Sequence, residues 1–287
     1  MRYCGRDFSS AEFASIRQLI AAHPTATRAR LSRLVCERLD WRRPDGRLKD
    51  MSCRVAMLRM QDDGCLQLPP PRNANNNGKP YRRRTSQGEP ASMIEAASPK
   101  ALADLHLQLV TERHDSHLHN ELIERYHYLG YQPLPGAQLR YFVRSEQRTL
   151  ALLAFGAGAW KTRPRDRFIG WNIRQREARL HLLVNNARFL ILPWVRCHNL
   201  ASRILGMAAR RLAQDWQRHY GYRPVLLETF VELPRFRGTS YRAANWTFLG
   251  ETRGRGKLDV HHRAALPKKA IWVYPLVKNF RQFLCTE

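Results

Sequence analysis

The sequence lacks long hydrophobic runs and paired cysteine motifs. No apolar stretch approaches the ~20 residues that a membrane-spanning helix requires, and the first residues lack the apolar core of a secretion signal. The six cysteines form no C-x-x-C pair and no repeated spacing, which argues against a zinc site. We therefore expect a cytoplasmic protein with no membrane partner and no bound metal.

The signatures of the common nucleotide-dependent enzymes and hydrolases are also missing. The sequence has no Walker loop, no G-x-S-x-G nucleophile elbow and no Rossmann fingerprint. The histidine-containing run at residues 114–119 lacks the alternation that would present two metal ligands from one strand. Without an ATP-binding loop of its own, the chain must leave any energy transduction to another protein.

Acidic residues are few, and basic residues dominate the chain. The 287 residues include 49 Lys and Arg against 24 Asp and Glu, a formal net charge of +25 and a sequence pI of about 10.8. Residues 1–98 hold 18 basic and 10 acidic residues, and residues 99–287 hold 31 and 14. This charge predicts a nucleic acid, with DNA favoured, that contacts both parts. An anionic membrane is disfavoured because no basic amphipathic helix with an aromatic face is present.

Residues 1–68 show three helical patterns followed by a short strand pattern. Ser9 or Ser10 can begin the first helix and Thr27 the second. Asp50 can cap a third helix whose inner face is Met51, Val55 and Leu58, before alternating residues 64–68. This order is typical of a winged helix-turn-helix, whose third helix enters the major groove. A helical cap or protein-docking domain is the alternative. The candidate nucleic-acid contacts of the third helix are Lys49, Arg54 and Arg59.

Residues 69–98 have the composition of a basic linker rich in Pro and Asn, which cannot bury enough apolar surface to order itself. Its arginines either clamp phosphate once bound or are solvated. They are Arg82, Arg83 and Arg84.

Residues 99–258 predict a mixed α/β core domain, and residues 259–287 a basic C-terminal extension. A strand at 188–192, a long helix at 199–219 capped by Asn199 and a strand at 225–231 form a βαβ unit with a parallel strand pair. The other expected strands cover 105–110, 138–144 and 149–154. The other expected helices cover 116–128 and 239–249, the latter closed by Gly250.

Several uncommon motifs lie in this core domain. The sequence resembles the DruA-type proteins of the Druantia anti-phage defence systems of bacteria. This resemblance implies a defence component that acts with other subunits, including a large helicase, and it implies no settled reaction. The motifs that carry it are HYLG at 127–130, IGW at 169–171, residues 186–194 and residues 227–257.

The order of the predicted elements is similar to that of Gcn5-related N-acetyltransferases, which implies an acetyltransferase-like core. In those enzymes a tyrosine often stands beside the leaving thiol, at the place of the short helix that begins near Tyr241. Their acetyl-CoA pyrophosphate normally rests on a glycine-rich loop, whereas residues 194–199 here contain no glycine. The cofactor is therefore left unknown.

Three residues are candidates for catalysis. Glu228 interrupts an apolar strand, which is costly unless the carboxylate is paired or used. It is either a general base or metal ligand, or the partner of an arginine such as Arg242 or Arg253. Tyr241 is either a general acid or a buried aromatic residue with a bonded hydroxyl. His127 is either a functional histidine or one that ends a helix.

Further candidates for nucleic-acid contact lie near the end of the core domain. Arg242, Asn245 and Trp246 share a predicted short helix. Trp246 could stack on a base together with Trp171 and Trp194, although at least two of these tryptophans are expected in the core. The glycine-containing basic loop suits backbone phosphates. Its candidate residues are Arg253, Arg255 and Lys257.

The leading hypothesis is a nucleic-acid-binding component of a multi-subunit anti-phage defence system. One alternative is an enzyme that modifies or cleaves nucleic acid on an acetyltransferase-like scaffold, and whether the chain is an enzyme stays open. A second alternative is a transposon accessory protein, because helix-turn-helix modules with basic domains also serve mobile elements.

Overall fold

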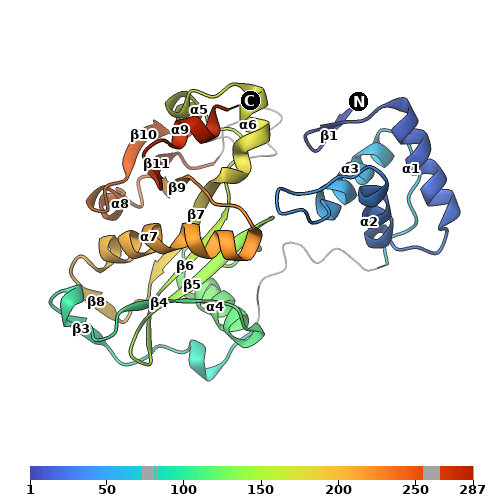
Figure 1. The fold of residues 1–287 in the computed structure, drawn as a ribbon. Coiled ribbons are helices and arrows are strands. Elements are labelled where there is room, and N and C mark those ends of the chain that lie inside the picture. Colours follow the sequence, from blue (N-terminus) through green and yellow to red (C-terminus); the bar gives the residue numbers. More distant parts are fainter. Residues whose placement is uncertain (73–80, 82, 255–265, 287) are drawn as a thin grey trace. The chain divides into compact units, whose positions relative to one another are not determined.

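The structure is a computed structural model that describes residues 1–72, 81, 83–254 and 266–286. It contains two compact units, Met1–Asn77 and Gly78–Glu287 (Figure 1). The division falls inside the segment expected to be a linker. Each unit has its own hydrophobic core. In the part of the chain that the structure describes, no helix is both long enough and apolar enough to cross a membrane.

The first unit consists of a short hairpin and three helices. Two of the helix starts confirm the sequence prediction: Ser9 Oγ accepts a hydrogen bond from the Glu12 amide, and Thr27 Oγ1 accepts one from the Arg30 amide, each at 3.2 Å. The elements are β1 (Arg2–Tyr3), β2 (Arg6–Asp7), α1 (Ser10–Ala22), α2 (Arg28–Arg38) and α3 (Asp50–Asp62).

The inner face of α3 differs from the predicted one. Met51 and Val55 are 56% and 40% exposed, although both were expected to face inward. Asp50 is the first helical residue, and Lys49 before it provides no side-chain cap. Apolar residues lie on both sides of this helix, so periodicity alone did not determine which side packs. The buried side consists of Cys53, Ala56, Met57 and Met60.

The strand predicted at residues 64–68 does not form. Leu66 and Leu68 still pack into the core of the first unit. The Leu68 amide donates to Gln61 Oε1 at 3.0 Å, so a side chain satisfies the backbone in place of a neighbouring strand. The winged-helix class therefore stays a prediction.

The second unit is a mixed α/β unit around a seven-stranded sheet with the order β10-β11-β9-β7-β6-β5-β4. Strands β7 and β9 are parallel, which confirms the predicted βαβ unit, and the other pairs in this sheet are antiparallel. The strands are β4 (His106–Leu109), β5 (Gln138–Ser145), β6 (Arg148–Ala157), β7 (Leu183–Ile191), β9 (Leu226–Glu232), β10 (Thr247–Glu251) and β11 (Lys269–Pro275).

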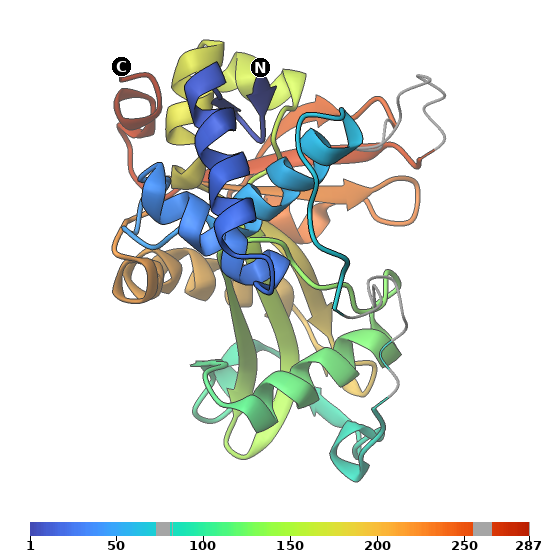
Figure 2. The ribbon, with the colours of Figure 1, turned by 90° about the vertical axis from the view of Figure 1, so that its right-hand side faces the viewer.

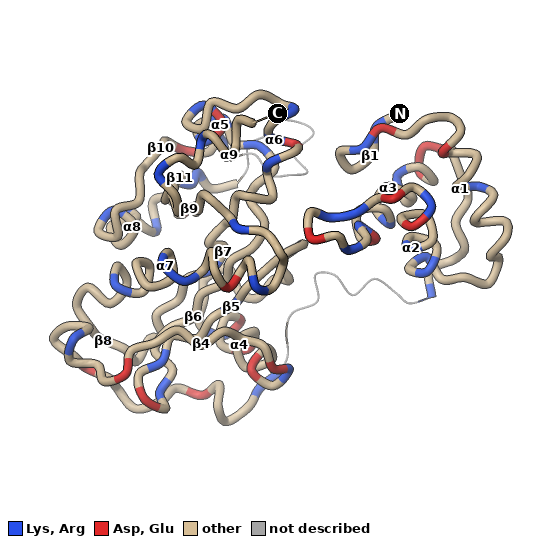
Figure 3. The backbone as a smooth tube through the Cα atoms, viewed as in Figure 1, with Lys and Arg blue, Asp and Glu red and all other residues tan. Residues whose placement is uncertain are grey.

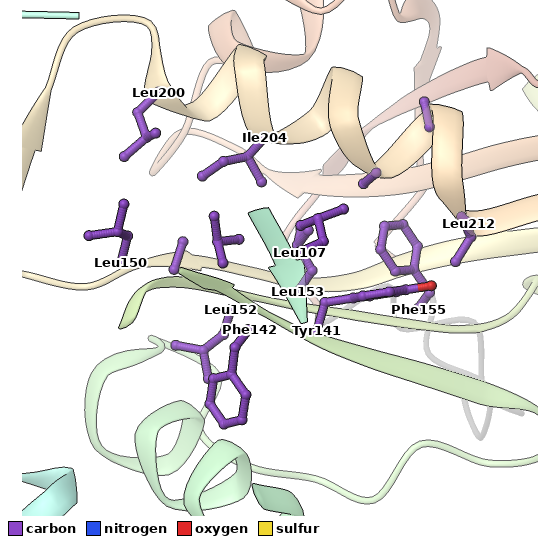
Figure 4. Close-up of a cluster of buried hydrophobic side chains, with 14 of the residues drawn as sticks. Leu107, Tyr141, Phe142, Leu150, Leu152, Leu153, Phe155, Leu200, Ile204 and Leu212 are labelled. Atoms are coloured by element: carbon purple, nitrogen blue, oxygen red, sulfur yellow. The ribbon is translucent and has the colours of Figure 1, made fainter. Parts of the chain in front are cut away.

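Two helices cover opposite faces of the sheet, α4 (Arg113–Tyr126) and α7 (Leu200–Tyr220) (Figure 4). Alternation along β5 sends neighbouring side chains to the two faces. Tyr141 points to α7, where its hydroxyl donates to Asp215 Oδ2 at 3.1 Å. Phe142 points to α4 and packs edge-on against His119, with ring centroids 5.5 Å apart. The sheet is therefore buried between helices on both sides.

Three smaller helices gather at one end of the sheet (Figure 1, Figure 2). The first two join β6 to β7 and were not predicted, because their segment is short and strongly basic rather than clearly amphipathic. Residues 266–286, expected to be an extension, contain β11 and the third helix, and β11 lies between β9 and β10. These helices are α5 (Arg163–Ile169), α6 (Ile173–Arg179) and α9 (Phe280–Leu284).

Other boundaries also differ from the sequence prediction. Strand β7 begins at Leu183, five residues before the expected start. The expected helix 239–249 is the short α8 (Thr239–Ala243), and Gly250 lies within β10 instead of closing the helix. Asn199 does precede α7, but its side chain makes no cap hydrogen bond.

Part of the expected linker is structured. Strand β3 (Ile94–Ala96) pairs in parallel with β8 (Val195–Cys197). It is followed by a short 3-10 helix, η2 (Pro99–Ala101). A second 3-10 helix, η1 (Ser86–Gly88), packs on α4, where the Tyr126 hydroxyl donates a hydrogen bond to the Gly88 carbonyl at 2.9 Å.

Candidate functional site

The two parallel strands of the sheet separate after a short contact. β7 and β9 pair at three positions, ending with Asn185 opposite Glu228. Beyond this point β7 continues along β6, and β9 continues along β11. Backbone groups that lose a strand partner must find other hydrogen bonds, and polar side chains can supply them. The residues immediately past the separation are Asn186 and Thr229.

A hydrogen-bonded group of side chains occupies this point. The Thr229 hydroxyl donates to the Asn186 carbonyl at 3.0 Å. The Tyr241 hydroxyl, brought in by α8, donates to Asn186 Oδ1 at 2.8 Å. Burial raises the pKa of Tyr241 to about 12. The phenol therefore stays protonated near neutral pH and donates its hydrogen bond to the Asn186 side chain.

Two further motif residues are linked to this group through β7, where Asn186 Nδ2 donates to the Arg188 carbonyl at 3.1 Å. His127 ends α4, and its Nδ1 accepts a hydrogen bond from the Leu129 amide at 3.2 Å, so the neutral ring carries its proton on Nε2. Burial and the neighbouring Arg188 lower the pKa of His127 to about 4. Arg188 on β7 reaches the Gly130 carbonyl, with 3.5 Å from its Nε to that oxygen.

We call these five residues the splay cluster: His127, Asn186, Arg188, Thr229 and Tyr241. They come from segments far apart in the sequence, and each belongs to one of the motifs that carry the family resemblance. The cluster combines a neutral imidazole, a phenol donor, an amide and a cation. Such a set can bind a polar or anionic group, and can transfer a proton if a substrate reaches it.

Glu228 has a partner that the sequence did not indicate. The carboxylate is fully buried and paired with the equally buried Arg165 of α5, with 2.9 Å between Oε2 and Nη1. Its Oε1 accepts a hydrogen bond from the Ala159 amide at 2.5 Å. The expected pairing with Arg242 or Arg253 is therefore wrong, and the pairing interpretation of Glu228 fits the geometry. Burial raises the pKa of Glu228, and Arg165 opposes that shift.

The same arginine organises the helices between β6 and β7. Its Nε and Nη2 donate to Asp166 Oδ1 at 3.0 and 2.7 Å, and Nη1 donates to the Ala159 carbonyl at 2.6 Å. The Trp171 indole donates to the same Asp166 oxygen at 3.1 Å. Arg176 of α6 lies 3.7 Å from Asp166 Oδ2. No local sequence pattern indicates Arg165 as the centre of this network.

The candidate nucleic-acid contacts are spread over both units. Arg59, Arg83, Arg84, Arg242, Asn245 and Arg253 are exposed. Arg54 is half-buried beside Asp50, with 3.6 Å between Nη2 and Oδ2. Lys49 lies over the Trp41 ring, 6.0 Å from its centroid. Arg82, Arg255 and Lys257 lie outside the described residues.

The predicted stacking residues are buried. Trp246, Trp171 and Trp194 are 4%, 7% and 8% exposed. Trp246 packs edge-on against Tyr241, with ring centroids 5.1 Å apart. The stacking role predicted for Trp246 does not fit this position, because its ring presents no open face to a base. The large exposed aromatic side chains of the second unit include Trp160 and Phe248, and neither lies in a motif that predicted a functional role.

Two observations bear on whether the chain could hold a metal ion or a cofactor. Over the described ranges, no three His, Cys, Asp or Glu side chains are grouped as metal ligands would be. The glycine-free connection of residues 194–199 forms β8, and a shallow hollow beside it is lined by Glu95, Ala96, Ala97, Arg196, Cys197 and His198.

The structure thus defines a basic two-unit protein whose α/β unit contains a polar cluster where two parallel strands separate. The family described as Druantia protein DruA matches residues 60–264. The chain belongs to this DruA family, which confirms the resemblance seen in its motifs and implies a component of the Druantia defence system. No curated protein shows significant similarity to the chain.

The solved structures that resemble the chain include acetyltransferases, whose element order is similar to the one predicted from the sequence. A Bacillus subtilis acetyltransferase in complex with CoA is 9% identical, with a TM-score of 0.37 over 61% of this chain and 100% of that chain. A Drosophila melanogaster polyamine N-acetyltransferase is 12% identical, with a TM-score of 0.38 over 59% and 100%. The Escherichia coli ribosomal-protein-S18-alanine N-acetyltransferase is 8% identical, with a TM-score of 0.36 over 60% and 94%. Similarities of this size support no activity, substrate or cofactor for this chain.

Proposed function

We propose that this DruA-family chain is the nucleic-acid-binding component of a Druantia anti-phage defence system. It acts together with other subunits of that system, a helicase among them, which supply the energy transduction that the chain lacks. Family membership favours this function over a transposon accessory role. DNA is the favoured ligand.

The charge of the second unit supports this proposal. Several arginines are used internally: Arg165 holds Glu228, and Arg140 donates to Asn120 Oδ1 at 2.8 Å. Figure 3 shows further Lys and Arg positions on and around α5 and α6. Lys161, Arg163, Arg167 and Arg174 are exposed, and among the described residues no carboxylate lies within ion-pair distance of them. These unpaired cations, three on α5 and α6 and one just before α5, are the observation that carries the proposal, because phosphates are their natural partners.

A salt series on the full chain tests this function. We expect binding to DNA that weakens steeply as salt rises, with log K falling linearly against log salt because each neutralised phosphate releases counterions. Fluorescence anisotropy with labelled single- and double-stranded DNA measures it. Replacing Lys161, Arg163, Arg167 and Arg174 together by Ala is expected to lower the slope by up to about 3–4, at about 0.9 per lost phosphate contact. Lys100→Ala, at an exposed lysine outside α5 and α6, is the control. Absence of binding to any nucleic acid at about 50 mM salt, where phosphate contacts are strong, contradicts the proposal.

The splay cluster supports a second candidate function, an enzyme that modifies or cleaves nucleic acid. The observation in its favour is that strand β7 joins three separate motifs: Arg188 lies beside His127 and reaches the Gly130 carbonyl, and Asn186, two positions earlier, accepts the hydrogen bond of Tyr241. His127 and Tyr241 are the candidate acid–base residues. The buried pairing of Glu228 favours an anchoring role for that residue.

Tyr241→Phe tests the enzymatic candidate. The variant loses the hydrogen bond to Asn186 and keeps the ring against Trp246, so the expected stability loss is only about 1 kcal/mol. Protection against phage, measured by plaque counts, is expected to be lost while DNA affinity is unchanged. Tyr126→Phe, which loses a comparable hydrogen bond to Gly88 outside the cluster, is the matched control. Full protection by Tyr241→Phe contradicts a catalytic role for this phenol.

A further inference from the structure

One tryptophan of the chain differs from all the others in exposure. The chain has seven tryptophans, and all of them lie in described residues. Trp160, between β6 and α5, is 52% exposed, whereas the remaining six are between 1% and 8% exposed. Leaving the largest aromatic ring in water sacrifices hydrophobic stabilisation, so an isolated exposed indole suggests a binding role.

The backbone at this tryptophan is held firmly. Ala159, its neighbour in the chain, donates its amide to Glu228 and accepts at its carbonyl from Arg165. Both charged groups are fully buried. On the ring itself, the Arg176 guanidinium lies 5.7 Å from the centroid. A ring presented from such a fixed segment loses little conformational entropy on binding.

The surroundings of the ring are positively charged. Lys161 and Arg163 follow within three positions, and both are exposed with no acidic partner among the residues that the structure describes. The nearby carboxylate of Asp166 is occupied by Arg165 and Trp171. The open cations therefore suit a ligand that carries negative charge beside a flat apolar ring.

We propose that Trp160 stacks on an unpaired nucleobase while Lys161 and Arg163 contact the phosphates on either side of it. This inference rests on the proposed nucleic-acid binding and assigns it a strand type. An indole stacks on any base, because every base has a π-face, and alternating cations follow the backbone of a single strand. In a duplex the bases are stacked on one another, so the ring reaches one only where the pairing is open.

Intrinsic tryptophan fluorescence of the full chain gives a direct test, because the single exposed indole dominates quenching by ligands in solution. Adding oligodeoxythymidylate at low salt is expected to quench the emission and to protect it from iodide. A single-stranded RNA of the same length tests whether the sugar matters. A blunt duplex of the same length is expected to bind with much less quenching. In Trp160→Phe, whose six remaining tryptophans are buried, the quenching is expected to disappear.

The affinity of Trp160 variants for single strands provides a second test. Trp160→Ala is expected to bind single strands roughly 5- to 100-fold more weakly, the usual effect of losing one base–aromatic stack, and Trp160→Phe is expected to recover much of that loss. Thermal unfolding checks that the exposed site tolerates both changes. Binding of single strands without quenching, and with unchanged affinity in Trp160→Ala, overturns the inference and leaves the proposed function standing. Failure of the wild-type chain to bind any nucleic acid overturns both.

Discussion

Glu228→Ala is expected to destabilise the second unit by about 3–5 kcal/mol, because the substitution leaves the Arg165 guanidinium buried without its carboxylate. The Ala159 amide loses its acceptor as well. For a unit of this size the loss corresponds to a fall in Tm of roughly 6–20 °C. Urea unfolding followed by circular dichroism measures the free energy. Loss of anti-phage defence in this variant then follows from loss of fold.

A double-mutant cycle separates the ion pair from simple loss of volume. Glu228→Leu combined with Arg165→Met replaces both charges by apolar groups. The free energy of unfolding of this double variant should therefore fall by much less than the sum of the losses in the two single variants. An exposed pair serves as the matched control: Arg2 and Asp7 lie 2.8 Å apart on the first unit and should contribute less than about 1 kcal/mol. A Glu228→Ala variant as stable as the wild type, yet inactive in defence, would instead favour a catalytic role.

The second unit is expected to lose stability as the pH falls from about 6.5 to 4, because its buried histidine cannot accept a proton there. His119 Nε2 lies 3.2 Å from the Leu153 carbonyl, and burial lowers the pKa of His119 to about 3. The unfolded chain binds that proton near pH 6.5, so the folded state loses free energy below this value. By pH 4 the loss reaches about 3 kcal/mol. His127 acts in the same direction, because its pKa is lowered to about 4.

His119→Gln isolates this effect. The glutamine amide can still donate to the Leu153 carbonyl but does not titrate. The difference in unfolding free energy between pH 7 and pH 4 should therefore shrink by most of the about 3 kcal/mol that His119 contributes. Carboxylates that titrate in the same range contribute equally to both proteins and cancel in the comparison. His219→Gln, at an exposed histidine of α7, should leave the difference unchanged. Identical pH dependence in the wild type and His119→Gln contradicts the assignment.

The chain's local signals predicted most elements of the second unit. Apolar alternation located β5 and β6, and helical periodicity located α4 and α7, because each pattern reflects one buried face. Prediction failed where a segment had no single face. Helix α3 has apolar residues on both sides, and the segment of α5 and α6 is so rich in arginine that its amphipathic pattern is weak. At β10, a glycine that suggested a helix end lies in a strand instead.

The charge of this protein, most of its helices and strands and its family motifs can be read from the sequence, since all of these depend on composition or on residues close together in the chain. The pairing of Glu228 with Arg165, 63 positions away, became visible only in the folded chain, as did the hydrogen bond of Tyr241 to Asn186 and the contact of Arg188 with Gly130. The tertiary structure also decided that Trp160 is exposed while Trp246 is buried. An ion pair and a buried ring are chosen by what packs against them across the sheet, and the sequence offers many arginines and tryptophans of equal local character.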